Sequence, residues 1–182
     1  MKLLIVSGPE ASGKTAIANV LAERLGYAYQ SKDAIKEPMY DSGEHDTNDS
    51  AWFEERAKQA FFDQISAFVT TETNAVIESN FIGHDRQRLI DCIGDADVAE
   101  IYCTARGFTS FRRFVARNES GRRHKGHHDR KWYWNIFWHD VARIFDIEWP
   151  YRPLGLSDKS ARLDTTDFSK INYEQLLEFA RN

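Results

Sequence analysis

Short continuous apolar runs alternate along the chain with longer segments in which apolar residues recur at helical spacing. The first run, LLIV at 3–6, ends near a glycine and predicts a buried strand over residues 2–7. In the next segment, 14–25, the apolar residues fall on one helical face, and Gly26 follows directly. Because glycine readily adopts the left-handed backbone that ends many helices, this pattern predicts an amphipathic helix over 14–25.

The same two patterns continue to the end of the chain. Further strands are expected at 27–30, 74–78, 98–103 and 161–163. Further helices are expected at 33–40, 50–70, 85–93, 108–118, 131–147 and 171–180. Since parallel strands need helical crossovers, this alternation predicts an α/β fold, a three-layer sandwich with a mostly parallel five-stranded sheet. No linker divides the chain, so we predict a single domain over residues 1–182.

Composition and charge agree with a globular protein. Hydrophobic residues make up 42% of the chain and charged residues 29%, a balance that excludes a disordered segment as the main feature. The net charge of −4 argues against a surface built wholly for nucleic acid. The N-terminal apolar run is too short for a secretion signal or a membrane span. We therefore expect a cytoplasmic protein with no membrane partner.

The loop between the first strand and the first helix carries the sequence GPEASGKT at 8–15, which fits the pattern G-x-x-x-x-G-K-[ST]. Its glycines allow the loop to curl, so that backbone N–H groups point inward at phosphates beside the positive end of the helix. Lys14 would reach the β- and γ-phosphates, and the Thr15 hydroxyl would bind Mg²⁺. We therefore predict that Mg·ATP is held by Gly8, Glu10, Ala11, Ser12, Gly13, Lys14 and Thr15.

A nucleotide site of this kind serves either a kinase or an NTPase that drives a partner. The guanine-reading pattern N-K-x-D is absent, and the D-x-x-G match at 91–94 closes a predicted helix instead of following a strand. ATP-driven machines usually need a longer chain and an apolar strand that ends in aspartate, whereas the strand at 74–78 is short and ends in Glu78. These features favour a kinase, with an ATPase or nucleotide switch as the alternative.

A kinase needs two further carboxylates, and the sequence offers both. Asp33 follows the second predicted strand and would accept the proton of the attacking hydroxyl. Glu78 ends the third and would hold Mg²⁺ or its water shell. The alternative for Asp33 is a structural role as the N-cap of the helix that it opens.

Together these motifs resemble the small P-loop kinases, a group that includes polynucleotide kinases, chloramphenicol phosphotransferase, zeta-type toxins and gluconate or shikimate kinases. The resemblance rests on GPEASGKT at 8–15, SKDAIKE at 31–37, VIESNF at 76–81, the arginine-rich run at 112–130 and LDTTD at 163–167. It implies a P-loop NTPase fold of the nucleotide-kinase type, with Asp33 as the catalytic base. It also implies that Lys36 and Glu78 face the acceptor and that Thr165 or Thr166 lies beside the adenine.

Basic residues far outnumber acidic ones between 106 and 131, where the resemblance places a helical lid at about 118–130. Arg113 and Arg117 are one helical turn apart, so they would point together at the phosphates. We predict that Arg113 binds the nucleotide and that Arg117 and Arg122 act in transfer, where arginine neutralises charge and the closed lid excludes water. A solvated helical face and a nucleic-acid groove are the alternatives.

The remaining polar and aromatic clusters bear on the acceptor. His124, His127, His128 and Asp129 resemble a zinc site, but no cysteine lies near them, so we favour contacts with phosphate or substrate. The aromatic helix at 131–147 suits either the core or an acceptor pocket. A small-molecule or nucleotide-like hydroxyl is the expected acceptor, and a polynucleotide 5′ end is the less favoured one. The sequence does not define the oligomeric state.

Overall fold

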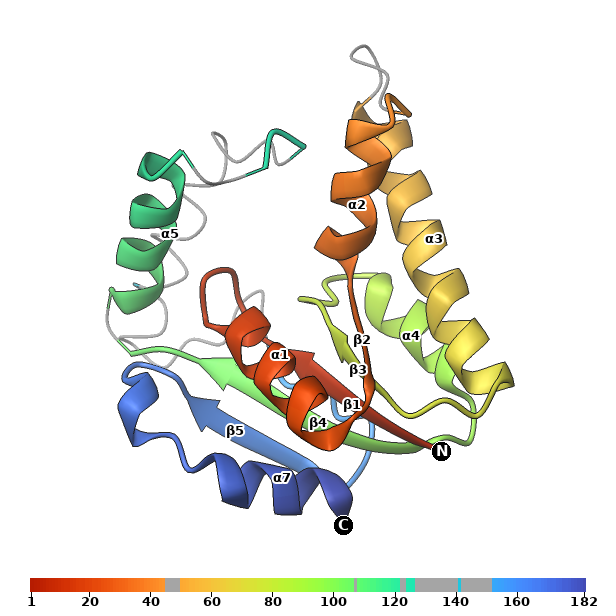
Figure 1. The fold of residues 1–182 in the computed structure, drawn as a ribbon, viewed down its shortest axis with the longest axis vertical. Coiled ribbons are helices and arrows are strands. Elements are labelled where there is room, and N and C mark those ends of the chain that lie inside the picture. Colours follow the sequence, from red (N-terminus) through yellow and green to blue (C-terminus); the bar gives the residue numbers. More distant parts are fainter. Residues whose placement is uncertain (45–49, 107, 122–123, 127–140, 142–151) are drawn as a thin grey trace.

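The computed structural model describes residues 1–44, 50–106, 108–121, 124–126, 141 and 152–182. Five strands form one sheet (Figure 1), and they are β1 (Lys2–Ser7), β2 (Ala28–Ser31), β3 (Ala75–Glu78), β4 (Asp97–Thr104) and β5 (Ser160–Asp164). Their order is β2-β3-β1-β4-β5, and every neighbouring pair is parallel. The predicted α/β class and five-stranded sheet are confirmed, with a sheet that is wholly parallel.

The described helices lie close to the predicted bounds. They are α1 (Lys14–Leu25), α2 (Lys32–Asp41), α3 (Ser50–Thr70), α4 (Asp85–Ile93), α5 (Thr109–Glu119) and α7 (Tyr173–Arg181), with a short 3-10 helix η2 at Phe168–Lys170. The chain after β5 therefore forms two short elements, where one helix over 171–180 was predicted. The side chains of Asp167 and Asn172 accept hydrogen bonds from Ser169 N and Gln175 N, and these two caps start η2 and α7 separately. The predicted helix at 131–147 and most of the predicted lid lie outside the described residues.

Both faces of the sheet are covered, which explains why the central strands β1 and β3 read as nearly continuous apolar runs. Leu4 and Val6 of β1 pack with α1 and α7 in one buried cluster. Leu3 and Ile5 pack with α3 and α4 in a second cluster on the other face. The first strand is thus buried on both sides, and the three predicted layers are present (Figure 1).

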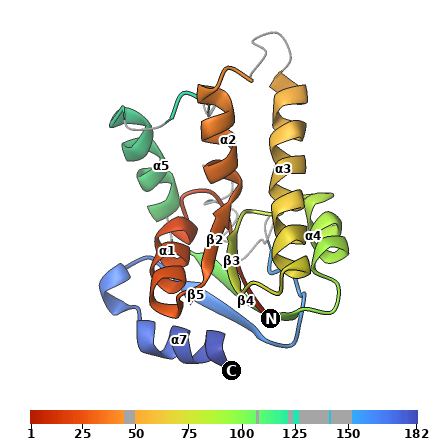
Figure 2. The ribbon, with the colours of Figure 1, turned by 45° about the vertical axis from the view of Figure 1, so that its right-hand side comes forward.

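The parallel arrangement decides where a site can form. The five strands end at one edge of the sheet, and in open α/β sheets ligands bind outside these carboxyl ends. The loop after β1 lies at this edge, and α2 and α5 rise on either side of it in both views (Figures 1 and 2). Residues from β1, β2, β3 and the two flanking helices can therefore meet there.

Candidate active site

The loop at 8–15 has the tightly curled backbone that a phosphate cradle requires. Gly8, Ala11 and Gly13 have φ values of 140°, 55° and 88°. A Cβ at Gly8 would lie 2.2 Å from the carbonyl oxygen of Cys103, and one at Gly13 would lie 2.6 Å from a ring carbon of Phe168. Only glycine fits these two positions without a shift of the neighbouring strand or ring.

The start of α1 suits an anion. No side chain caps α1 within the described residues, so the first N–H groups of the helix remain available to a ligand. The hydroxyl of Ser12 is buried and, among the described residues, has no hydrogen-bond partner. Lys14 Nζ donates to the carbonyl oxygen of Pro9 at 2.8 Å, which holds the ammonium group over the loop. These residues fit a bound triphosphate.

Glu78 at the end of β3 is joined to the loop through Thr15. Thr15 Oγ1 donates to Glu78 Oε2 at 3.2 Å, and the hydroxyl of Tyr29 on β2 donates to the same oxygen at 3.2 Å. The pKa of Glu78 lies above its ordinary value because burial outweighs the opposing effect of nearby Lys14. Burial also raises the pKa of Tyr29. A hydroxyl and a carboxylate held together are oxygen ligands that suit Mg²⁺, so these residues fit the ion that the fold family uses.

The role of helix cap at the start of α2 belongs to Ser31. Its side chain accepts a hydrogen bond from Ala34 N at 3.0 Å, and its backbone is extended. The alternative that Asp33 is the N-cap is therefore wrong. Asp33 lies in the first turn of α2, exposed to solvent, with its negative charge at the positive end of the helix.

Arg117 on α5 lies 5.8 Å from the ring of Phe114 and within electrostatic reach of carboxylates at this edge of the sheet. Burial has the largest effect and lowers the pKa of Arg117 below its ordinary value. The carboxylates of Asp33, Glu10 and Glu78 act in the opposite direction, and Asp33 has the strongest effect of the three. The side chain nevertheless keeps an exposed surface. Three carboxylates from α2, the loop and β3 thus lie within electrostatic reach of one guanidinium group.

Arg113, one turn earlier on α5, makes a different set of contacts. It donates to the carbonyl oxygens of Thr165 at 2.7 Å and of Thr166 at 3.2 Å, and it stacks on the ring of Phe168 at 4.7 Å. The hydroxyl of Thr165 is buried within hydrogen-bond distance of the carbonyl oxygens of Ser12 and Thr104. The loop after β5 is therefore fixed against the phosphate loop, and base contact by Thr165 stays a prediction.

The other predicted acceptor residue, Lys36, is buried on α2. Its ammonium forms an ion pair with Glu54 of α3 and lies 6.0 Å from the ring of Phe53. Nearer the loop, Asn80 donates to the carboxylate of Glu10 at 3.0 Å, a pair that the sequence did not predict. Asn80 lies in the motif VIESNF at 76–81, which gave no sign of this contact, and Tyr29 carries no sequence signal of its own, because both contacts depend on which segments become neighbours.

Part of the predicted lid can be placed. His124 lies against α2, with Nε2 3.1 Å from the carboxylate of Asp41 and its ring 5.6 Å from that of Tyr40. Among the described residues, no group of three or more histidine, cysteine, aspartate or glutamate side chains is arranged to hold a metal ion. The remaining predicted lid residues lie outside the described residues, namely Arg122, Arg123, His127, His128 and Asp129.

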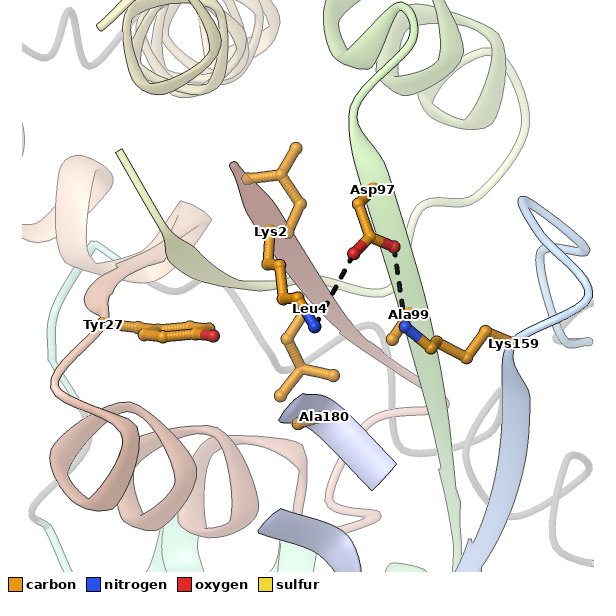
Figure 3. Close-up of a pocket in the computed structure, with 8 residues that line it drawn as sticks. Lys2, Leu4, Tyr27, Asp97, Ala99, Lys159 and Ala180 are labelled. Atoms are coloured by element: carbon orange, nitrogen blue, oxygen red, sulfur yellow. Dashed lines mark ion pairs between the residues drawn. The ribbon is translucent and has the colours of Figure 1, made fainter. Parts of the chain in front are cut away.

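A shallow pocket lies at the opposite edge of the sheet (Figure 3). Lys2, the first residue of β1, and Lys159 both pair with Asp97, the first residue of β4, at 3.8 Å and 3.5 Å. Tyr27 and Ala180 also line this pocket. Because the strands begin here and end at the phosphate loop, this pocket is separate from the candidate active site.

The fold and site together define a class of protein. A parallel sheet in this order, a P-loop after its central strand and a carboxylate at the end of the neighbouring strand are the features of a P-loop kinase fold. The sequence profile of a family described as an AAA domain matches residues 3–134. The chain therefore belongs to that family, and its structural relatives are those of the small P-loop kinases. No curated protein matches the chain.

Solved structures give the same fold. A candidate kinase from Chloroflexus aurantiacus is 27% identical and superposes with a TM-score of 0.82, covering 99% of this chain and 96% of that chain. Shikimate kinase from Bacteroides thetaiotaomicron is 13% identical, with a TM-score of 0.56 over 98% of this chain and 94% of that chain. One chain of an RNA repair complex is 18% identical, with a TM-score of 0.56 over 86% of this chain and 49% of that chain. The last two show the fold alone.

The structure also bears on membrane association. No helix within the described residues combines the length and the apolar character needed to cross a lipid bilayer.

Proposed function

We propose that this protein is an ATP-dependent kinase that transfers the γ-phosphate of Mg·ATP to a hydroxyl group of a small-molecule or nucleotide-like acceptor. The observation that carries the proposal is the meeting of three parts at one edge of the sheet. A P-loop with Lys14 and Thr15 lies beside Glu78 of β3, and the carboxylate of Asp33 lies within electrostatic reach of Arg117. Hydrolysis also uses a group that positions water and an arginine that stabilises charge, so dependence of ADP release on an acceptor is what separates a kinase from an ATPase.

The chain's own residues supply binding, orientation and proton transfer. The backbone of the phosphate loop and Lys14 bind the β- and γ-phosphates, and Lys14 leaves Pro9 to do so. Asp33 accepts the proton of the acceptor hydroxyl as its oxygen bonds to the γ-phosphorus. The bond to the bridging oxygen breaks, and its electron pair leaves with ADP. Arg117 stabilises the negative charge on the phosphoryl oxygens during transfer.

Thr15 and Glu78 would hold Mg²⁺, directly or through its water shell. When bound, the ion neutralises charge on the β- and γ-phosphate oxygens. The cofactors of the proposed reaction are therefore ATP and Mg²⁺.

A small acceptor is favoured over a polynucleotide end. The net charge of −4 would repel a long phosphate backbone, and carboxylates of Asp33, Glu10 and Glu78 gather at the transfer site itself. A cytoplasmic location suits this proposal, because ATP and small hydroxyl compounds are both available there. Shikimate kinase, which shares the fold, acts on a small acceptor by its name.

The experiment that tests the proposal measures ADP release by the purified protein with a panel of acceptors. The panel contains sugars, hydroxylated antibiotics, nucleosides and an oligonucleotide with a 5′-hydroxyl end. Release of ADP that requires a small hydroxyl compound and disappears in Lys14→Ala supports the proposal. Steady release that no acceptor changes identifies an ATPase, and release that only the oligonucleotide stimulates identifies a polynucleotide kinase. Either result overturns the acceptor class proposed above.

A further inference from the structure

Tyr29, a half-buried residue of β2, contacts the candidate active site. On β2 it is paired with Val76 of β3, and Ser31, two residues later, is paired with Glu78. Alternate residues of a strand lie on the same face, so Tyr29, Ser31 and Glu78 share one face of the sheet. The ring of Tyr29 packs against the buried cluster formed with α1. This packing leaves the ring half-buried, and its hydroxyl lies beside Glu78 at the edge where the site forms.

The hydroxyl of Tyr29 meets one particular oxygen. Tyr29 and Thr15 both donate to Oε2 of Glu78, each at 3.2 Å. Within the part of the chain that the structure describes, Oε1 of Glu78 accepts no hydrogen bond. The two donors therefore divide the carboxylate into an anchored oxygen and an available one.

The carboxylate of Glu78 depends more on hydrogen bonds to fix its position than the carboxylate of an aspartate would. A glutamate side chain has three rotatable bonds, and fixing them costs on the order of 1–2 kcal/mol of conformational free energy. Thr15 holds Oε2 with a single hydrogen bond, and the hydroxyl of Tyr29 adds a second donor to the same oxygen. The ring of Tyr29 is half-buried, and its packing against the cluster with α1 restricts the position of this second donor.

We propose that Tyr29 is a positioning residue that holds Oε2 of Glu78 beside Thr15, so that Oε1 stays available to Mg²⁺ or its water shell. This inference rests on the proposed function, since it gives Tyr29 a task only where Glu78 serves the metal. Partners that orient metal ligands typically change metal affinity or activity by about 10- to 100-fold when removed. Tyr29 is thus expected to act on the metal and to leave nucleotide recognition unchanged.

The test compares two variants that each lose one phenolic oxygen. Tyr29→Phe keeps the ring and removes the hydroxyl at Glu78. Tyr27→Phe is the matched control, because its ring packs against the same cluster and lines the pocket at the far edge of the sheet (Figure 3). Binding of Mn²⁺ is measured by electron paramagnetic resonance of the free ion, with the β,γ-imido analogue of ATP saturating.

We expect the Mn²⁺ dissociation constant to rise about tenfold or more in Tyr29→Phe and to stay unchanged in Tyr27→Phe. In turnover, the Mg²⁺ concentration for half-maximal rate should rise similarly, while kcat at saturating Mg²⁺ falls only a few-fold. Equal Mn²⁺ binding by Tyr29→Phe and the parent would overturn the inference and leave the proposed function standing. Failure of the parent to bind the nucleotide analogue would overturn both.

Discussion

The side chain of Ser31 accepts a hydrogen bond from the backbone N–H of Ala34, at 3.0 Å, and thereby caps α2. Because Ser31 is the N-cap, Asp33 in the first helical turn does not cap the helix. The two residues can therefore be separated by mutation, although they lie only two positions apart in the sequence. A stability defect is expected from one and a catalytic defect from the other.

Asp33→Asn should abolish most transfer while the fold persists. Asparagine keeps the size and polarity of the side chain but does not accept the proton of the acceptor hydroxyl, and loss of a general base costs about 10²-fold or more in rate. The melting temperature and ATP affinity should remain near those of the parent. Rates come from acceptor-dependent ADP release, and stability from thermal unfolding.

Ser31→Ala is the matched control for this prediction. Loss of an N-cap costs about 1 kcal/mol, so the melting temperature should fall by about 2–4 °C while transfer below that temperature is largely kept. Near-parental transfer by Asp33→Asn would remove Asp33 as the base and make Glu78 the stronger candidate.

Arg117→Ala should lower kcat by about 10³-fold, the scale seen when an arginine that stabilises the transferring group is removed. Arg112→Ala is the control, because Arg112 is exposed on the same helix, α5. Affinity for a fluorescent ADP analogue should change little in either variant, since the proposed role arises only during transfer. If both variants keep kcat within a few-fold of the parent, the basic face of α5 serves solvation alone.

Glu78→Gln should stabilise the nucleotide-free protein at neutral pH while it removes transfer. Burial raises the pKa of Glu78 in the folded state, so above the ordinary glutamate pKa of about 4.3 the folded protein binds more protons than the unfolded chain. Stability attributable to this group therefore decreases as pH rises from that value through the raised pKa. Glutamine carries no charge and avoids this loss.

The gain is expected to be on the order of 1 kcal/mol at pH 7–8, or about 2–4 °C in melting temperature, and to vanish toward pH 4. Thermal unfolding of both proteins across this pH range, in EDTA and without nucleotide, provides the measurement. A difference that does not vary with pH, or a variant less stable than the parent at pH 7–8, would contradict the prediction.

Much of the architecture was predictable because it follows from local patterns. The run LLIV at 3–6 predicted β1, since both of its faces are buried, and GPEASGKT at 8–15 predicted the phosphate loop. Contacts between strands were not predictable in this way. Tyr29 looks like an ordinary strand residue until β2 and β3 become neighbours, and only then does its hydroxyl meet Glu78.

The cap of α2 shows a second limit. Ser31 and Asp33 are both common N-cap residues, and the choice between them depends on where β2 ends. Because β2 extends to Ser31, as set by its pairing with Glu78, the helix starts directly afterwards. The pairing of Ser31 with Glu78 therefore decides which residue caps α2, a choice that N-cap propensity alone does not make.

Thr165→Val should weaken nucleotide binding by loosening the phosphate loop. The Thr165 hydroxyl is buried between the carbonyl oxygens of Ser12 and Thr104, so it ties the loop after β5 to the P-loop and to the end of β4. Valine has nearly the same shape but donates no hydrogen bond, and leaving a buried acceptor without its donor costs about 1–3 kcal/mol. We expect a melting temperature lower by several degrees and a several-fold higher KM for ATP, measured by thermal unfolding and steady-state kinetics.

Thr165→Ser keeps the hydroxyl and should restore both values. If Thr165→Val raises the KM without lowering the melting temperature, the hydroxyl acts on the bound nucleotide itself, as the resemblance to small P-loop kinases implies.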